Sequence, residues 1–206
     1  MKHQQRHVVL ILDLLQDFNI LRPIACLAAA ETEMPVTLLV SKRFRERDSQ
    51  GIWATELEEL GAFVGASIVP FESDFEVYKY LAGKEGIIFA GSESNLNAHV
   101  TSHRIFRYAP PDFLKVTLQH GYECVGFHQN REQSIAFGED IRFAADIICS
   151  WMDADFLGPG RKLCILRPIL TDGEGKCMAQ LIRRIPACHS SYAVRQEIKQ
   201  FVLCRF

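Results

Sequence analysis

The sequence predicts an α/β fold in which a parallel β-sheet carries helices on both of its faces. Short apolar runs recur from the N-terminus onward, each bounded by polar or turn residues, and such runs are typical of strands buried on both faces. Segments with helical spacing of apolar residues lie between these runs. Strands that alternate with helices predict a parallel sheet joined by right-handed crossovers.

Six apolar runs are predicted to be the strands of this sheet. Each is three to five residues long and lacks the polar alternation of a strand that faces water on one side. The predicted strands are residues 8–12, 36–40, 67–69, 86–90, 116–118 and 146–149.

The helix before the third strand shows one apolar stripe. Its spacing of four, three and four residues places the apolar side chains on a single helical face that we expect to pack on the sheet. Gly65 follows the stripe and is expected to end the helix. The stripe consists of Trp53, Leu57, Leu60 and Val64.

Three further helices are predicted from capping and stop signals. Ser73 and Glu76 have the spacing of a capping box, and Gly83 stands where a C-terminal cap belongs. A helix over residues 96–108 is stopped by two prolines, and another is predicted over residues 131–144.

The alternation of strands and helices is lost after residue 156. The sequence therefore divides into a domain of residues 1–156 and an irregular or helical tail of residues 157–206. Two helices are predicted in the tail, over residues 178–185 and 191–204, and the second has an apolar stripe.

Composition excludes several functional classes. The chain has 206 residues, 23 basic against 25 acidic side chains and a formal charge of -2, so it lacks the basic field that attracts nucleic acid. The longest apolar run, residues 24–30, is far shorter than the ~20 residues that span a bilayer. Seven cysteines without paired spacing predict free thiols and a cytoplasmic protein.

Polar side chains follow four of the predicted strands. In a parallel sheet, ligands bind where the loops at the carboxyl ends of the strands converge. We therefore expect a substrate site among these residues. They are Asp13 after the first strand, Ser41, Lys42 and Arg43 after the second, Ser92, Glu93 and Ser94 after the fourth, and Gln119, His120 and Gly121 after the fifth.

His120 is the leading candidate for a catalytic residue. A histidine beside a flexible glycine at a strand end can take up a proton near neutral pH, or donate a hydrogen bond to a sugar or phosphate oxygen. The alternative is a histidine that bonds a neighbouring carbonyl and only shapes the loop. The residue spacing leaves both interpretations open.

Two other segments have a functional and a structural interpretation. Residues 91–95 precede a predicted helix, so their hydroxyls and amides could bind a phosphate, or Ser94 or Asn95 could simply cap the helix. The basic run that begins at Lys42 could also bind a phosphate. The more ordinary interpretation is a solvated loop balanced by Glu46 and Asp48.

Neither a metal nor a cofactor is predicted. His99 and His103 are four residues apart, but no third ligand accompanies them, and an Asp-x-Asp triplet at residues 153–155 is too common a pattern to assign. The glycine patterns of dinucleotide-binding domains, P-loops and nucleophile elbows do not occur.

Four motifs in a fixed order resemble the N-terminal half of a GT-B type glycosyltransferase, from residue 8 to about residue 153. The motifs are the first strand with the helix of residues 22–30 after it, Gly-Ile-Ile-Phe-Ala-Gly-Ser at residues 86–92, Val-Thr-Leu-Gln-His-Gly at residues 116–121, and Ala-Ala-Asp-Ile-Ile-Cys-Ser at residues 144–150. This order is similar to that of enzymes that build bacterial surface polysaccharides or transfer glycerol phosphate.

The resemblance implies a Rossmann-like domain that forms a single half of a GT-B fold. It implies transfer of a glycosyl or glycerol phosphate group from a nucleotide-activated donor to a hydroxyl acceptor. His120 would act at the reacting centre, and Asp13, Ser92, Glu93, Gln119 and Gly121 would bind substrate.

The donor-binding half is missing from the resemblance, because only about 50 residues follow the last motif. We therefore expect catalysis to need a separate donor-binding subunit or a homo-oligomer. The alternative is a non-catalytic binding or regulatory module that docks a partner through the helix predicted over residues 191–204.

Overall fold

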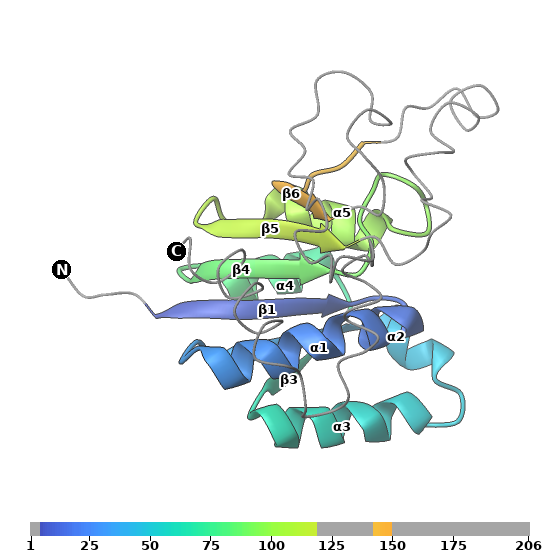
Figure 1. Cartoon of the computed structure of the whole chain (residues 1–206). Helices are drawn as coiled ribbons and strands as arrows, with labels where there is room; N and C mark the ends of the chain where they lie inside the picture. The colour runs from blue at the N-terminus through green and yellow to red at the C-terminus, as the bar shows by residue number, and fades with distance from the viewer. Residues whose placement is uncertain (1–4, 119–141, 150–206) are drawn as a thin grey trace, which may run out of the picture.

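A computed structural model describes residues 5–118 and 142–149 as one parallel sheet covered by helices (Figure 1). The strands are β1 Arg6–Leu12, β2 Val36–Ser41, β3 Ser67–Phe71, β4 Glu85–Ala90, β5 Phe113–Leu118 and β6 Ile147–Cys149. Their order in the sheet is β3-β2-β1-β4-β5-β6, and every neighbouring pair is parallel. The Rossmann-like α/β fold predicted from the sequence is confirmed.

The direction of the strand order reverses beside β1. From β1 the chain first builds outward through β2 to β3, and then returns to place β4 on the other side of β1. Leu10 at the centre of the sheet pairs with Leu38 of β2 and with Phe89 of β4. The loops after β1 and β4 therefore flank the point where a ligand usually enters such a sheet.

Five helices cover the two faces of the sheet. They are α1 Leu15–Glu31, α2 Lys42–Arg47, α3 Ile52–Val64, α4 Asp74–Leu81 and α5 Val100–Tyr108. Side chains of α1, α2 and α3 belong to one core cluster, and side chains of α4 and α5 belong to the other. The alternation of side chains along β1 explains the division.

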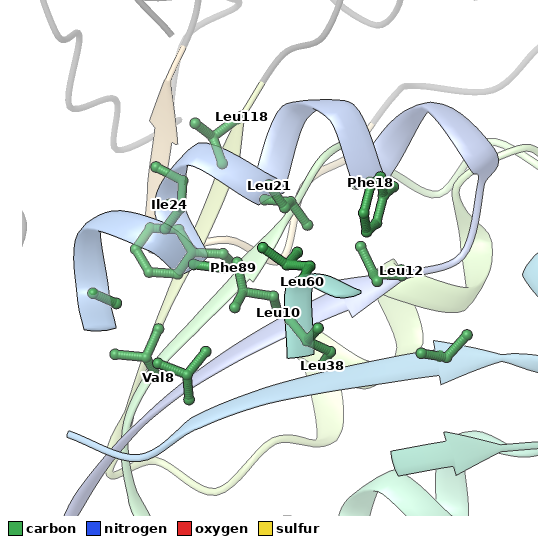
Figure 2. Close-up of a cluster of buried hydrophobic side chains, with 14 of the residues drawn as sticks. Val8, Leu10, Leu12, Phe18, Leu21, Ile24, Leu38, Leu60, Phe89 and Leu118 are labelled. Atoms are coloured by element: carbon green, nitrogen blue, oxygen red, sulfur yellow. The ribbon is translucent and has the colours of Figure 1, made fainter. Parts of the chain in front are cut away.

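Figure 2 shows the cluster between the sheet and α1. Val8, Leu10 and Leu12 face this cluster, whereas Val9 and Ile11 face the cluster on the opposite side of the sheet. All five side chains are at most 1% exposed, and burial on both faces explains why the sequence of this strand is an uninterrupted apolar run. Each such side chain contributes roughly 1.5–3 kcal/mol through burial.

Two predicted helices are confirmed with their ends. Gly65 ends α3 at a φ of 66°, a left-handed conformation that glycine adopts without strain. Ser73 caps α4, because its hydroxyl accepts a hydrogen bond from the amide of Glu76 at 3.4 Å. The apolar stripe of α3 packs on the sheet through Leu57 and Leu60.

The segment after β2 was predicted to be a solvated loop, and this prediction is wrong. It forms α2, because the Ser41 hydroxyl accepts a hydrogen bond from the Phe44 amide at 3.0 Å and the Phe44 side chain is fully buried. Lys42 and Glu46 form an i,i+4 ion pair on its outer surface.

The helix after β4 starts later than predicted. The first residue of α5 is Val100 rather than residue 96, so neither Ser94 nor Asn95 caps it. The Ser94 hydroxyl bonds the His99 ring at 3.0 Å, and the Asn95 side chain accepts from the Arg142 amide at 2.7 Å. The predicted helix over residues 131–144 is also wrong at its end, because residues 142–144 are not helical.

The outer strand β3 is short and only lightly covered. Ser67, Ile68 and Pro70 are exposed, and Phe71 anchors the end of the strand in the core. Pro70 pairs with Val40 of β2 and has no N–H to contribute to the sheet.

Several sequence predictions lie outside the described residues. These include Gln119, His120 and Gly121, the Asp-x-Asp triplet at residues 153–155 and the tail of residues 157–206. Among the described residues, Cys26 and Cys149 form no disulfide. None of the helices described above is long and apolar enough to cross a lipid bilayer.

Candidate ligand-binding site at the carboxyl edge of the sheet

A cavity of about 370 Å³ lies at the carboxyl ends of β1, β2 and β3. This volume is within the range of roughly 300–1,000 Å³ that is usual for small-molecule sites. The first turns of α5 form one wall of the cavity. Its polar lining includes Asp13 after β1, Lys42 and Arg43 after β2, Asp74 after β3, and Thr101 and Arg104 from α5.

Asp13 and Arg43 form the most buried ion pair of the cavity. The Arg43 guanidinium donates to a carboxylate oxygen of Asp13 at 3.1 Å and to the carbonyl of Ala98 at 2.8 Å. The Asp13 side chain is 2% exposed and that of Arg43 is 31% exposed. Arg43 thereby joins the ends of β1 and β2 to the loop before α5.

The second carboxylate oxygen of Asp13, Oδ1, is buried without a hydrogen-bond partner among the described residues. An unsatisfied buried acceptor costs about 1–3 kcal/mol. The pair with Arg43 keeps the carboxylate in place in spite of this cost. Because this oxygen is buried, Asp13 shapes the wall of the cavity through its bond to Arg43 and not through an acceptor open to the cavity.

The turn between β1 and α1 is closed by a carboxylate from the chain itself. Asp17, in the first turn of α1, accepts hydrogen bonds from the backbone amides of Asp13 at 3.0 Å and Leu14 at 2.7 Å. In dinucleotide-binding sheets the corresponding turn is open and binds phosphate through its amides. Here those two amides already donate to a carboxyl oxygen of the chain itself.

Burial raises the pKa of Asp17 to about 7, because the side chain is almost completely removed from water. The two amide hydrogen bonds favour the charged form and limit this rise. Gly91, the first residue after β4, packs directly against the carboxyl group, and a Cβ atom at residue 91 would lie 2.5 Å from Asp17 Oδ1. The strand order reverses beside β1, and we call this place the switch point. The two loops that flank the switch point are therefore in contact.

Glu93 ties together three parts of the chain on the far side of the switch point. Its carboxylate accepts from the backbone amides of Ala144 at 3.0 Å and Ala145 at 3.1 Å, and it contacts the His103 ring. The Glu93 side chain is completely buried, and that of His103 is 10% exposed. This network holds the segment before β6 against the loop before α5.

The structure brings some of the predicted site residues together and separates others. Asp13 lines the cavity, whereas Ser92 and Glu93 are not among its lining residues and lie in the loop after β4. Both oxygens of Glu93 bond protein donors, and Ser92 is half-buried. Gln119, His120 and Gly121 follow β5 directly in the sequence but lie outside the described residues.

Sequence reasoning missed Asp17, Thr101 and Arg104. An acidic residue in the first turn of a helix is a recognisable capping signal, but the helix was expected to begin only at residue 22. Thr101 and Arg104 come to the cavity because α5 packs beside α4, which local patterns do not reveal.

Metal binding gains no support from the described residues. His99 and His103 each bond another side chain, and no three His, Cys, Asp or Glu residues of residues 5–118 and 142–149 gather as metal ligands do. Comparison of the chain with protein-family models, with curated proteins and with solved structures gave no match.

Proposed function

We propose that this domain is the acceptor-binding half of an enzyme that transfers a glycosyl or glycerol phosphate group from a nucleotide-activated donor to a hydroxyl. The observation that carries the proposal is the cavity at the carboxyl ends of β1–β3, with the buried Asp13–Arg43 pair in its wall. Carboxylates and guanidinium groups of fixed orientation are well suited to bind the hydroxyls of a polyol. The motif resemblance agrees with this role.

The closed turn between β1 and α1 also favours an acceptor over a nucleotide. A pyrophosphate at this turn would meet the carboxyl groups of Asp13 and Asp17 in place of free backbone amides. We therefore infer that the activated donor binds elsewhere, in a separate donor-binding subunit or in a second copy of the chain. The domain by itself would then hold the acceptor without turning it over.

His120 is the proposed general base. It follows Leu118, the last residue of β5, by two positions, and the carboxyl end of β5 lies at the same edge of the sheet as the cavity. As the acceptor oxygen bonds to the donor carbon or phosphorus, its proton passes to the imidazole of His120. The bond to the nucleotide breaks in the same step, and the nucleotide leaves with the bonding electrons.

Ligand mapping by NMR on the full 206-residue chain tests the proposal. We expect glucose and other polyols to shift the amide signals of Asp13, Arg43 and Thr101, and UDP-glucose to leave the β1–α1 turn unshifted. Asp13→Asn is expected to weaken polyol binding several-fold. Asp112→Asn is the matched control, because this exposed aspartate precedes β5 at the opposite edge of the sheet.

Two results would contradict the proposal. One is binding of UDP-glucose at the β1–α1 turn, which would make the domain a nucleotide-binding one. The other is self-association of the chain with no polyol binding in the cavity, which would favour a non-catalytic docking module. In an assay that restores transfer, a His120→Ala variant with an unchanged rate would exclude the proposed base.

A further inference from the structure

The charges in the wall of the cavity are not all paired. Arg43 is bonded to Asp13 at 3.1 Å, and Lys42 lies 3.8 Å from Glu46. Glu72 lies 3.7 Å from Arg45, a neighbour of the cavity on α2. Once these three pairs are set aside, Arg104 and Asp74 remain as the charged lining residues whose side chains have no ion pair or hydrogen bond to the described part of the chain.

Arg104 is held in position by the rest of α5. Ile105 and Phe106, the next two residues of the helix, are buried in the core, and His103 bonds Glu93. The helix therefore cannot rotate without exposing two large apolar side chains. The guanidinium is presented to the cavity as an exposed and uncompensated positive charge.

Asp74 does not have the same excess of charge. It is the first residue of α4, where the partial positive charge of the helix N-terminus compensates a carboxylate. Of the two unpaired groups, Arg104 therefore has the greater need for a counterion. Asp74 remains available to accept hydrogen bonds from ligand hydroxyls.

We propose that the cavity binds a compact polyol that carries an anionic group, with the phosphate or carboxylate on Arg104 and the hydroxyls on Asp74. This inference rests on the proposed acceptor function and specifies its substrate class. The planar guanidinium can bond two oxygens of either anion at once. Thr101, one turn before Arg104 on α5, adds a hydroxyl to the same wall.

Titration of the full-length protein with four probes tests the inference, with affinities read from NMR shifts. The probes are glucose, glucose 6-phosphate, glucuronate and inorganic phosphate. We expect glucose 6-phosphate or glucuronate to bind at least tenfold more tightly than glucose, because a hydrogen bond to a charged group contributes more than a neutral one. The preferred probe identifies the anionic group.

Arg104→Gln is expected to remove most of this preference for the anionic sugar over glucose. Arg107→Gln is the matched control, because Arg107 is exposed on the same helix beside Tyr108 and does not line the cavity. Asp74→Asn is expected to weaken glucose and the anionic sugar by the same factor. Thermal unfolding of each variant verifies that the fold is intact.

Three results would overturn the inference. Equal affinity for glucose and both anionic sugars, unaffected by Arg104→Gln, would refute the anion subsite and leave the acceptor function standing. Binding of inorganic phosphate as tightly as glucose 6-phosphate would refute the contribution of the polyol. Binding of none of the four probes would refute both the inference and the acceptor function.

Discussion

Replacing Asp17 with asparagine is expected to make the stability of the protein less dependent on pH. The buried carboxyl group has a pKa of about 7 in the folded protein, against its ordinary value of 3.8. Between these two values the folded state holds a proton that the unfolded state has lost. The contribution of the protonated carboxyl to stability is therefore fully present below pH 3.8. It is lost as the pH rises from there through about 7.

The size of the effect follows from the two pKa values. Each pH unit inside this window lowers the free energy of unfolding by up to about 1.4 kcal/mol. Integrated from pH 5 to pH 8, the loss from Asp17 is on the order of 2–3 kcal/mol, and most of it falls below pH 7. Asparagine has the same shape and can accept the two amide hydrogen bonds, but it does not titrate.

Urea denaturation of wild type and Asp17→Asn at pH 5, 6, 7 and 8 measures the difference. The variant should gain stability relative to wild type with each step up to pH 7, whereas the exposed control Asp112→Asn should follow the wild-type curve. A constant difference between wild type and Asp17→Asn across this range would refute the account of a desolvated carboxyl group. A steeper fall in the stability of Asp17→Asn with rising pH would contradict the predicted direction of the effect.

Three further variants test the contacts around the switch point and the cavity. Gly91→Ala should destabilise the protein by about 1–3 kcal/mol, because the new methyl group overlaps the Asp17 carboxyl. An unchanged melting temperature would show that the two loops are not packed together. Glu93→Gln should lower the free energy of unfolding by about 1–3 kcal/mol, since an amide nitrogen would face backbone N–H donors. An unchanged stability in urea denaturation would show that Glu93 does not hold these segments together. Ser73→Ala should cost about 1 kcal/mol through loss of the α4 cap, measured by thermal unfolding, and no loss would contradict the capping contact.

The central strands could be predicted because the middle of the sheet is buried on both faces. Val8 to Leu12 form a continuous apolar run for this reason, and β2 and β4 repeat the pattern. The helix α2 was missed because its six residues include a single buried side chain, Phe44, which is too little to produce a periodic pattern. The start of α1 was missed because the helix was expected only over residues 22–30, and Asp17 marks a first turn that lies before this range.

The candidate site could be predicted only in part. Asp13 was found because it directly follows a recognisable strand, and position after a strand is a local property of the sequence. Arg104 and Asp74 line the same cavity because α5 packs beside α4. Their proximity depends on contacts between distant segments, and one sequence contains no local signal of such contacts.

The proline on the outer strand bears on whether another chain could extend the sheet at this edge. β3 is five residues long, and Pro70 removes one N–H group from it. A guest strand that tried to continue the sheet past β3 would find a short and interrupted row of hydrogen-bonding groups. Extension of the sheet by a strand of another chain is therefore disfavoured at the β3 edge.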